Sequence, residues 1–130
     1  MESLQIRTGA ISLEILDDAG NSRGVFSFNP EDVESAKQVI ELQTEFEAKQ
    51  LDFEERAKAC TDAESKVTLL NEVVNYFRDA IDRCFGTGSS DLLFGNAKTL
   101  SMFEDFFNGI TPYYQKASKA RIAKYKKLNK

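Results

Sequence analysis

The feature that most constrains the fold is an apolar pattern with helical spacing between residues 67 and 84. Apolar residues recur there at alternating intervals of three and four, which places them on one face of an α-helix. The stripe consists of Val67, Leu70, Val74, Phe77, Ile81 and Cys84, widened by Leu69, Val73 and Ala80. We therefore predict that this segment is the central core helix and that Cys84 is its last inward side chain.

A long helix is also predicted before this segment. Asn29 and Pro30 are followed by two acids, a pattern typical of a helix that begins with an Asn N-cap and a Pro in the first turn. Along the charged segment that follows, apolar residues recur every seven positions, at Val39, Phe46, Phe53 and Cys60. Such a narrow stripe packs on one side, either inside the chain or against another copy. The capping-box spacing of residues 61–64 (TDAE) ends this helix and starts the core helix.

A β-hairpin is predicted at the start of the chain. Residues 10–16 and 24–28 alternate apolar and polar positions, and the segment between them, DDAGNSR, is rich in turn formers. Two strands are not stable alone in water, so the hairpin must pack on the helices.

The last third of the chain is predicted to be helical. From Thr99 onward it carries an apolar cluster that needs burial: Leu100, Met102, Phe103, Phe106, Phe107 and Ile110. Pro112 then marks either a kink or a fresh helix start, after which a basic helix follows. The predicted fold class is α+β, mostly α: an N-terminal hairpin on a three- to four-helix core with a basic C-terminal helix. Residues 1–130 form one domain, divided into 1–28, 29–112 and 113–130.

The glycine-rich stretch CFGTGSSDLLFG, residues 84–95, raises the question of a phosphate-binding loop. A helix rather than a strand precedes it, and Lys98 stands three residues beyond Gly95, so the spacing of such a loop is absent. We predict instead that it joins two helices, with Gly86 in a left-handed conformation that ends the core helix.

Nothing in the sequence marks a catalytic or metal site. The chain has no histidine, and its two cysteines lie 24 positions apart, outside common zinc and redox spacings. We interpret both cysteines as small buried residues. Four charged residues of the core helix are interpreted as a solvated face of charge pairs: Arg78, Asp79, Asp82 and Arg83. We expect no enzyme activity, no cofactor and no metal.

Charge is distributed unevenly along the chain. Seven of the 17 Lys and Arg residues lie beyond Asp105, the last of the 21 acids, so residues 1–105 carry a formal charge of −11 and the remainder +7. This basic end is the predicted partner-binding segment, through Tyr113, Tyr114, Lys116, Lys119, Arg121, Lys124, Tyr125, Lys126 and Lys127. Its composition also predicts little packing on the rest of the chain, with contact against the acidic surface of the body left as an alternative.

The expected cellular location rests on the absence of a membrane span and of a secretory signal in the sequence. No apolar run approaches the roughly 20 residues of a membrane span, and the opening residues do not resemble a secretory signal. We expect a cytoplasmic protein with no membrane partner.

Several of these features together resemble a known family. They are the hairpin, the helix ending at Phe85, Gly86 and Gly88, the following Leu93-Phe94-Gly95, the Phe-rich helix and the basic end. This combination resembles the small tail-assembly-chaperone-like proteins of long-tailed phages and prophages of Gram-positive bacteria. The resemblance implies a non-enzymatic protein of the bacterial host cytoplasm that binds the tape-measure protein, with tail tube protein as a further partner. The alternative is a small nucleic-acid-binding or regulatory protein that uses the basic helix, although an acidic body disfavours nucleic acid.

Overall fold

Among residues 1–128, the chain forms two strands and four helices. The computed structural model describes the backbone of residues 1–128 and the side chains of residues 1–123. The elements are β1 (Ile11–Leu16), β2 (Ser22–Phe28), α1 (Val33–Ala59), α2 (Ala63–Phe85), α3 (Ser89–Phe94) and α4 (Ser101–Leu128). This arrangement, a hairpin followed by mostly helical structure, confirms the predicted α+β fold class.

The hairpin pairs β1 with β2 in antiparallel register. Leu13 lies opposite Phe26, and Ile11 lies opposite Phe28, so the apolar sides of both strands face the same way. The loop is held by Asp17, whose carboxylate accepts hydrogen bonds from the backbone N–H groups of Ala19 and Asn21. Strand β2 begins at Ser22, two residues before the predicted start.

The start of α1 lies later than the sequence predicted. Asp32, not Asn29, is the N-cap, because its carboxylate accepts the N–H of Ser35 at 2.9 Å. The Asn29 side chain instead accepts the N–H groups of Glu31 and Asp32, which forms a turn ahead of the helix. Two adjacent capping motifs therefore compete, and the one nearer the apolar stripe starts the helix.

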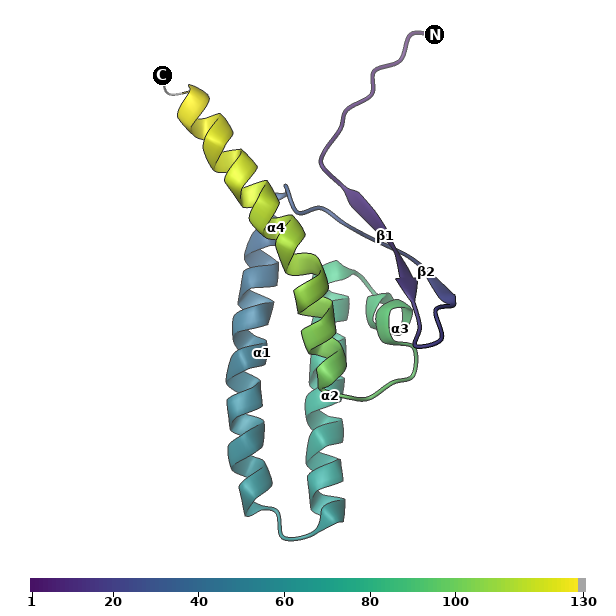
Figure 1. Ribbon diagram of the computed structural model, residues 1–130, viewed down its shortest axis with the longest axis vertical. Coiled ribbons are helices and arrows are strands. Elements are labelled where there is room, and N and C mark those ends of the chain that lie inside the picture. Colours follow the sequence, from purple (N-terminus) through teal and green to yellow (C-terminus); the bar gives the residue numbers. More distant parts are fainter. Residues whose placement is uncertain (129–130) are drawn as a thin grey trace.

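The start of α2 differs in the same way. The predicted cap was Thr61, but the structure uses Asp62, whose carboxylate accepts the N–H of Ser65 at 2.7 Å. Hydrogen bonding from Ser65 also lowers the pKa of Asp62. The three-residue link between α1 and α2 makes them an antiparallel pair of long helices (Figure 1).

Helix α4 lies across α1 and α2, with the hairpin and α3 beside it (Figure 1). Aromatic rings fill the space between these elements. Phe77 of α2 contacts Phe46 of α1 and Phe103 of α4, with ring centroids 4.9 and 5.6 Å apart. On the hairpin side, Phe26 contacts Phe106 of α4. The predicted burial of the Phe-rich segment is confirmed for Phe103, Phe106, Phe107 and Ile110, whereas Leu100 and Met102 are only partly buried.

The core stripe of α2 is shorter than predicted. Val67 is 64% exposed, and Cys84 is half-buried, whereas Val74, Phe77 and Ile81 are almost completely buried. The reason is visible in Figure 1: the linked ends of α1 and α2 extend past the beginning of α4, so α4 does not cover the first turns of α2. The prediction of Val67 as a core residue was therefore wrong.

Pro112 lies inside α4, which continues on both sides of it. The predicted alternative of a fresh helix start at this residue is therefore wrong. The segment that we assigned as a basic tail is the second half of a 28-residue helix, and its first half is part of the core.

Candidate functional site

The predicted partner-binding residues of α4 divide into two groups. The first group contacts the protein's own body. Tyr114 stacks on Phe28 and its hydroxyl lies 2.8 Å from the hydroxyl of Ser35, while Tyr113 meets Phe28 edge to face. Arg121 donates to the carbonyl oxygens of Pro30 and Glu31, at 3.4 and 3.2 Å.

These contacts correct the expectation that the basic segment packs little on the rest of the chain. Ala117 is also buried, so the helix is fixed to the hairpin and to the start of α1 as far as Arg121. Burial raises the pKa of Tyr114, an effect that the hydrogen bond with Ser35 opposes.

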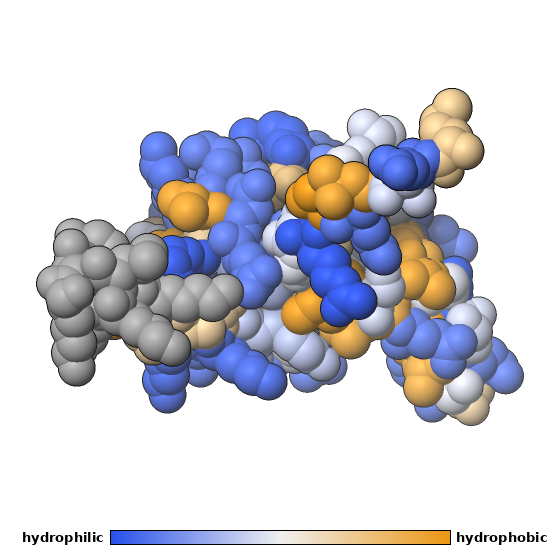
Figure 2. Space-filling view, turned by 90° about the horizontal axis from the view of Figure 1, so that it is seen from above, coloured by the Kyte–Doolittle hydropathy of each residue, from blue (hydrophilic) through white to orange (hydrophobic). Residues whose placement is uncertain are grey.

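The second group faces solvent. Lys116 and Lys119 are exposed, as is the apolar Ile122, at 53%. Lys124, Tyr125, Lys126 and Lys127 complete the predicted set, but they lie outside the residues whose side chains the structure describes. The last turns of α4 extend beyond the start of α1 (Figure 1). Viewed onto this end, the molecule is mainly hydrophilic, with separate hydrophobic patches (Figure 2).

Arg78 holds the glycine-rich connection between α2 and α4. Its guanidinium donates to the carbonyl oxygens of Gly95 and Ala97 and to the carboxylate of Asp91, at 2.7 to 3.0 Å, and its side chain is 12% exposed. Asp82 accepts the backbone N–H of Ser90 at 2.8 Å. The interpretation as a solvated charged face was therefore wrong for Arg78 and Asp82, because the loop folds back over them, whereas Asp79 and Arg83 are exposed.

Gly86 ends α2 with φ +112° and ψ 151°. Gly86 ends the helix as predicted, but the predicted left-handed conformation is wrong, because ψ lies far outside that region and only φ is positive. The stretch is therefore a joint whose shape depends on the conformational freedom of this glycine and on the hydrogen bonds that Arg78 donates.

The cysteines lie near opposite ends of α2, which is roughly 34 Å long at about 1.5 Å per residue. A disulfide between them within one chain is therefore excluded by distance. Both are half-buried rather than fully buried as predicted, and burial raises the pKa of Cys84.

Among the described residues, no group of three or more His, Cys, Asp or Glu side chains is arranged to hold a metal ion. None of the described helices has the length and apolar character needed to cross a membrane.

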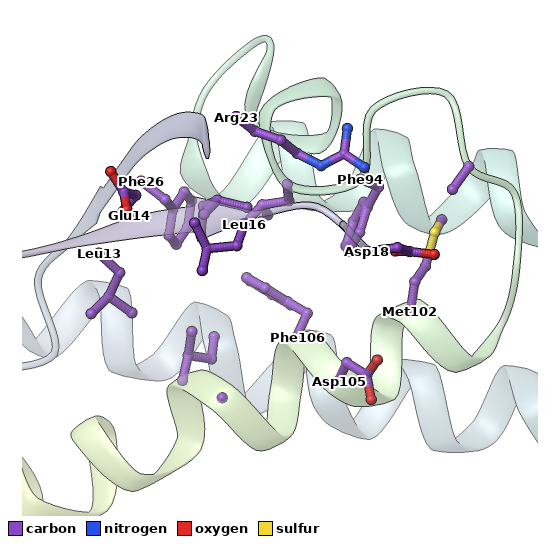
Figure 3. A pocket seen from close by; sticks show the side chains of 15 residues that line it. Leu13, Glu14, Leu16, Asp18, Arg23, Phe26, Phe94, Met102, Asp105 and Phe106 are labelled. Atoms are coloured by element: carbon purple, nitrogen blue, oxygen red, sulfur yellow. The ribbon is translucent and has the colours of Figure 1, made fainter. Parts of the chain in front are cut away.

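A groove that the sequence did not indicate lies between the hairpin and α4. It has a volume of about 430 Å³. Figure 3 shows Leu13 and Leu16 on the hairpin side and Phe106 pointing toward them from α4, with Phe94 of α3 at one side. Gly109 leaves the α4 wall open, since a Cβ atom added there would have no neighbour within 4 Å.

The rim of the groove is charged. Asp18 and Asp105 lie at one end, beside Met102, and Glu14 points away from the apolar floor (Figure 3). Arg23 also lines the groove, and its guanidinium lies close to Gly95. The rim therefore presents three acids and one arginine around an apolar interior. No single segment of the sequence indicates this groove, because its lining residues come from the hairpin, α3 and α4.

Comparison with protein families gives a match over most of the chain. The model of a family of unknown function, DUF6673, matches residues 23–130, which extend from β2 to the end of the sequence. No curated protein and no solved structure matches the chain. The match leaves out β1 and the residues before it.

Proposed function

The chain belongs to the DUF6673 family, and we propose that it is a non-enzymatic, phage tail-assembly-chaperone-like protein that binds the tape-measure protein in the bacterial host cytoplasm. Tail tube protein is a further candidate partner. The observation that carries the proposal is that the second half of α4 is rich in Lys and Arg, whereas residues 1–105 carry a formal charge of −11. The last turns of this helix extend beyond the start of α1 (Figure 1). The resemblance in the sequence supports the identity of the partner.

The division of residues along α4 suggests how the helix would work. Tyr113, Tyr114 and Arg121 fix the helix to the hairpin and to the start of α1. Because these side chains already contact the protein's own body, they would position the binding surface without contacting the partner. Lys116 and Lys119 remain free to approach an acidic or amphipathic helix, and Ile122 adds exposed apolar surface.

The charges would act mainly on the encounter with the partner. Complementary charge raises the rate of association and its dependence on salt more than it raises affinity. The acidic body would disfavour other acidic proteins except at the end of α4. A chaperone-like role requires such a reversible contact, because the partner must later be released into the assembling tail.

The test is a pull-down of the tape-measure protein encoded in the same phage or prophage. The Lys116→Glu/Lys119→Glu double variant should retain the thermal melt and bind more weakly, and raising salt should weaken binding of the unchanged protein. The matched control is Lys37→Glu/Lys66→Glu, which reverses two exposed lysines of α1 and α2 and should bind normally. Equal binding by both double variants at low salt would refute the role of α4.

A deletion provides a second arm of the test. Removing residues 124–130 takes away four of the seven cations but leaves the contacts of Tyr114 and Arg121 in place. We expect weaker binding with an unchanged melting temperature. Gel shifts with duplex and single-stranded DNA address the alternative: tight binding that the same variants abolish would favour a nucleic-acid-binding protein over the proposed chaperone.

A further inference from the structure

The groove beside the hairpin borders an open strand edge. Within the backbone described, β2 is the sole strand paired with β1, so the other edge of β1 has no strand partner. Four consecutive residues of β1, from Leu13 to Leu16, line the groove. Because alternate side chains of a strand point to opposite faces, lining by consecutive residues means that the strand edge itself faces the groove. Such an edge can accept another strand.

The segment ahead of β1 has the pattern of a strand but no pairing. Residues 3–7, SLQIR, place Leu4 and Ile6 on one side of an extended chain and Ser3, Gln5 and Arg7 on the other. Leu4 is 84% exposed and Ile6 71% exposed. The segment runs away from the body (Figure 1).

Contacts at its base direct this segment away from the groove of its own chain. The side chain of Asn29 donates to the carbonyl oxygen of Thr8 at 2.9 Å. Gly9, at φ +97°, packs directly on the side chain of Glu31. These contacts tie residues 8 and 9 to the turn before α1, so folding back onto β1 would require breaking them.

We propose that residues 3–7 of one copy add as a third strand to the open edge of β1 in a second copy. Leu4 and Ile6 then enter the groove and contact Phe106 and its neighbours on α4. The opposite side of the added strand carries Arg7, which comes next to Glu14 and the acidic rim. Opposite charges on adjacent strands stabilise such pairing.

The exchange is reciprocal in this proposal. Each copy donates one segment and accepts one, which gives a closed dimer with two identical contacts. The backbone hydrogen bonds of β1 provide affinity, and the alternation of Leu4 and Ile6 sets the register. This surface is separate from the basic half of α4, so either proposal can fail without the other.

The experiment measures dimerisation of the full chain by light scattering and sedimentation over a concentration series. Leu4→Ser/Ile6→Ser disables the donor segment, and Gly109→Leu fills the acceptor groove at a position where added atoms meet no neighbour. Each variant should lower the dimer association constant, by roughly tenfold or more for each aliphatic side chain that is no longer buried. Gln5→Ser and Gly109→Ala are the matched controls and should still form dimers.

Mixing the two disabled variants gives the sharpest result. The Gly109→Leu chain keeps an intact segment and the Leu4→Ser/Ile6→Ser chain keeps an open groove, so the mixture should form a one-to-one dimer that neither forms alone. A wild-type chain that stays monomeric at every concentration would overturn the proposal, as would dimers that persist in both variants. A monomer whose β1 amides lose hydrogen-exchange protection when Leu4 and Ile6 are replaced would also overturn it, since the segment would then occupy its own groove.

Discussion

Replacing Phe77 with Ala would test the aromatic centre of the fold. Phe77 is 1% exposed and its ring contacts Phe46, Tyr76 and Phe103, with centroids 4.9, 5.3 and 5.6 Å apart. Emptying a buried aromatic site typically costs about 3–5 kcal/mol. We expect about 4 kcal/mol here, because the neighbouring rings are anchored on different helices and cannot easily close the cavity.

Urea denaturation followed by circular dichroism measures this loss. The matched control is Val67→Ala on the same helix, for which we expect at most about 0.5 kcal/mol, since Val67 is 64% exposed. Phe77→Leu retains part of the volume and should cost about 1–2 kcal/mol, so the series stays measurable if the Ala variant unfolds. A loss below about 1 kcal/mol for Phe77→Ala would show that the ring is not central to the core.

Three further predictions concern the joint and the last helix. Gly86→Val should lower the free energy of unfolding by about 1–3 kcal/mol because a β-branched residue resists φ +112°, whereas Gly109→Ala should not, and thermal melts would compare them. Arg78→Lys should lower the free energy of unfolding by about 2 kcal/mol in urea melts, because an ammonium cannot reach two carbonyl oxygens and a carboxylate at once. An unchanged urea midpoint would show that these hydrogen bonds of Arg78 do not stabilise the fold. The raised pKa of Tyr114 means that the folded state keeps its proton longer than the unfolded state, so stability is complete below the unfolded pKa and falls as pH rises through the folded one. Melts at increasing alkaline pH should show a smaller decline in Tyr114→Phe than in the unchanged protein or in Tyr113→Phe.

The hairpin and the helices could be predicted because their signals are local. The alternation of apolar and polar residues at 10–16 matches the two-residue repeat of a strand, and the three-four spacing at 67–84 matches the turn of a helix. The structure forms a strand and a helix in these two segments. Periodicity identifies the inward face of a helix but not how far a neighbour covers it. Val67 shows the difference, since it continues the stripe at a level that α4 does not reach.

The candidate site was harder to predict because its contacts join distant parts of the chain. Composition alone made Tyr113, Tyr114 and Arg121 resemble free binding residues, yet their partners are Phe28, Ser35 and the carbonyl oxygens of residues 30 and 31. Arg78 is a related case, because its hydrogen bonds depend on how a glycine-rich loop folds back. The groove depends on three elements at once, and no single segment carries a signal for it.

The contact between α4 and the start of α1 bears on how the protein folds while it is being made. Ser35 and Tyr114 are separated by 79 positions, and Pro30 and Arg121 by 91. A growing chain that has reached the end of α3 therefore already contains Phe28, Phe46 and Phe77 but lacks the helix that shields them. Since closing such long loops is slow and exposed apolar surface promotes aggregation, the nascent chain should depend on ribosome-associated folding factors until α4 emerges.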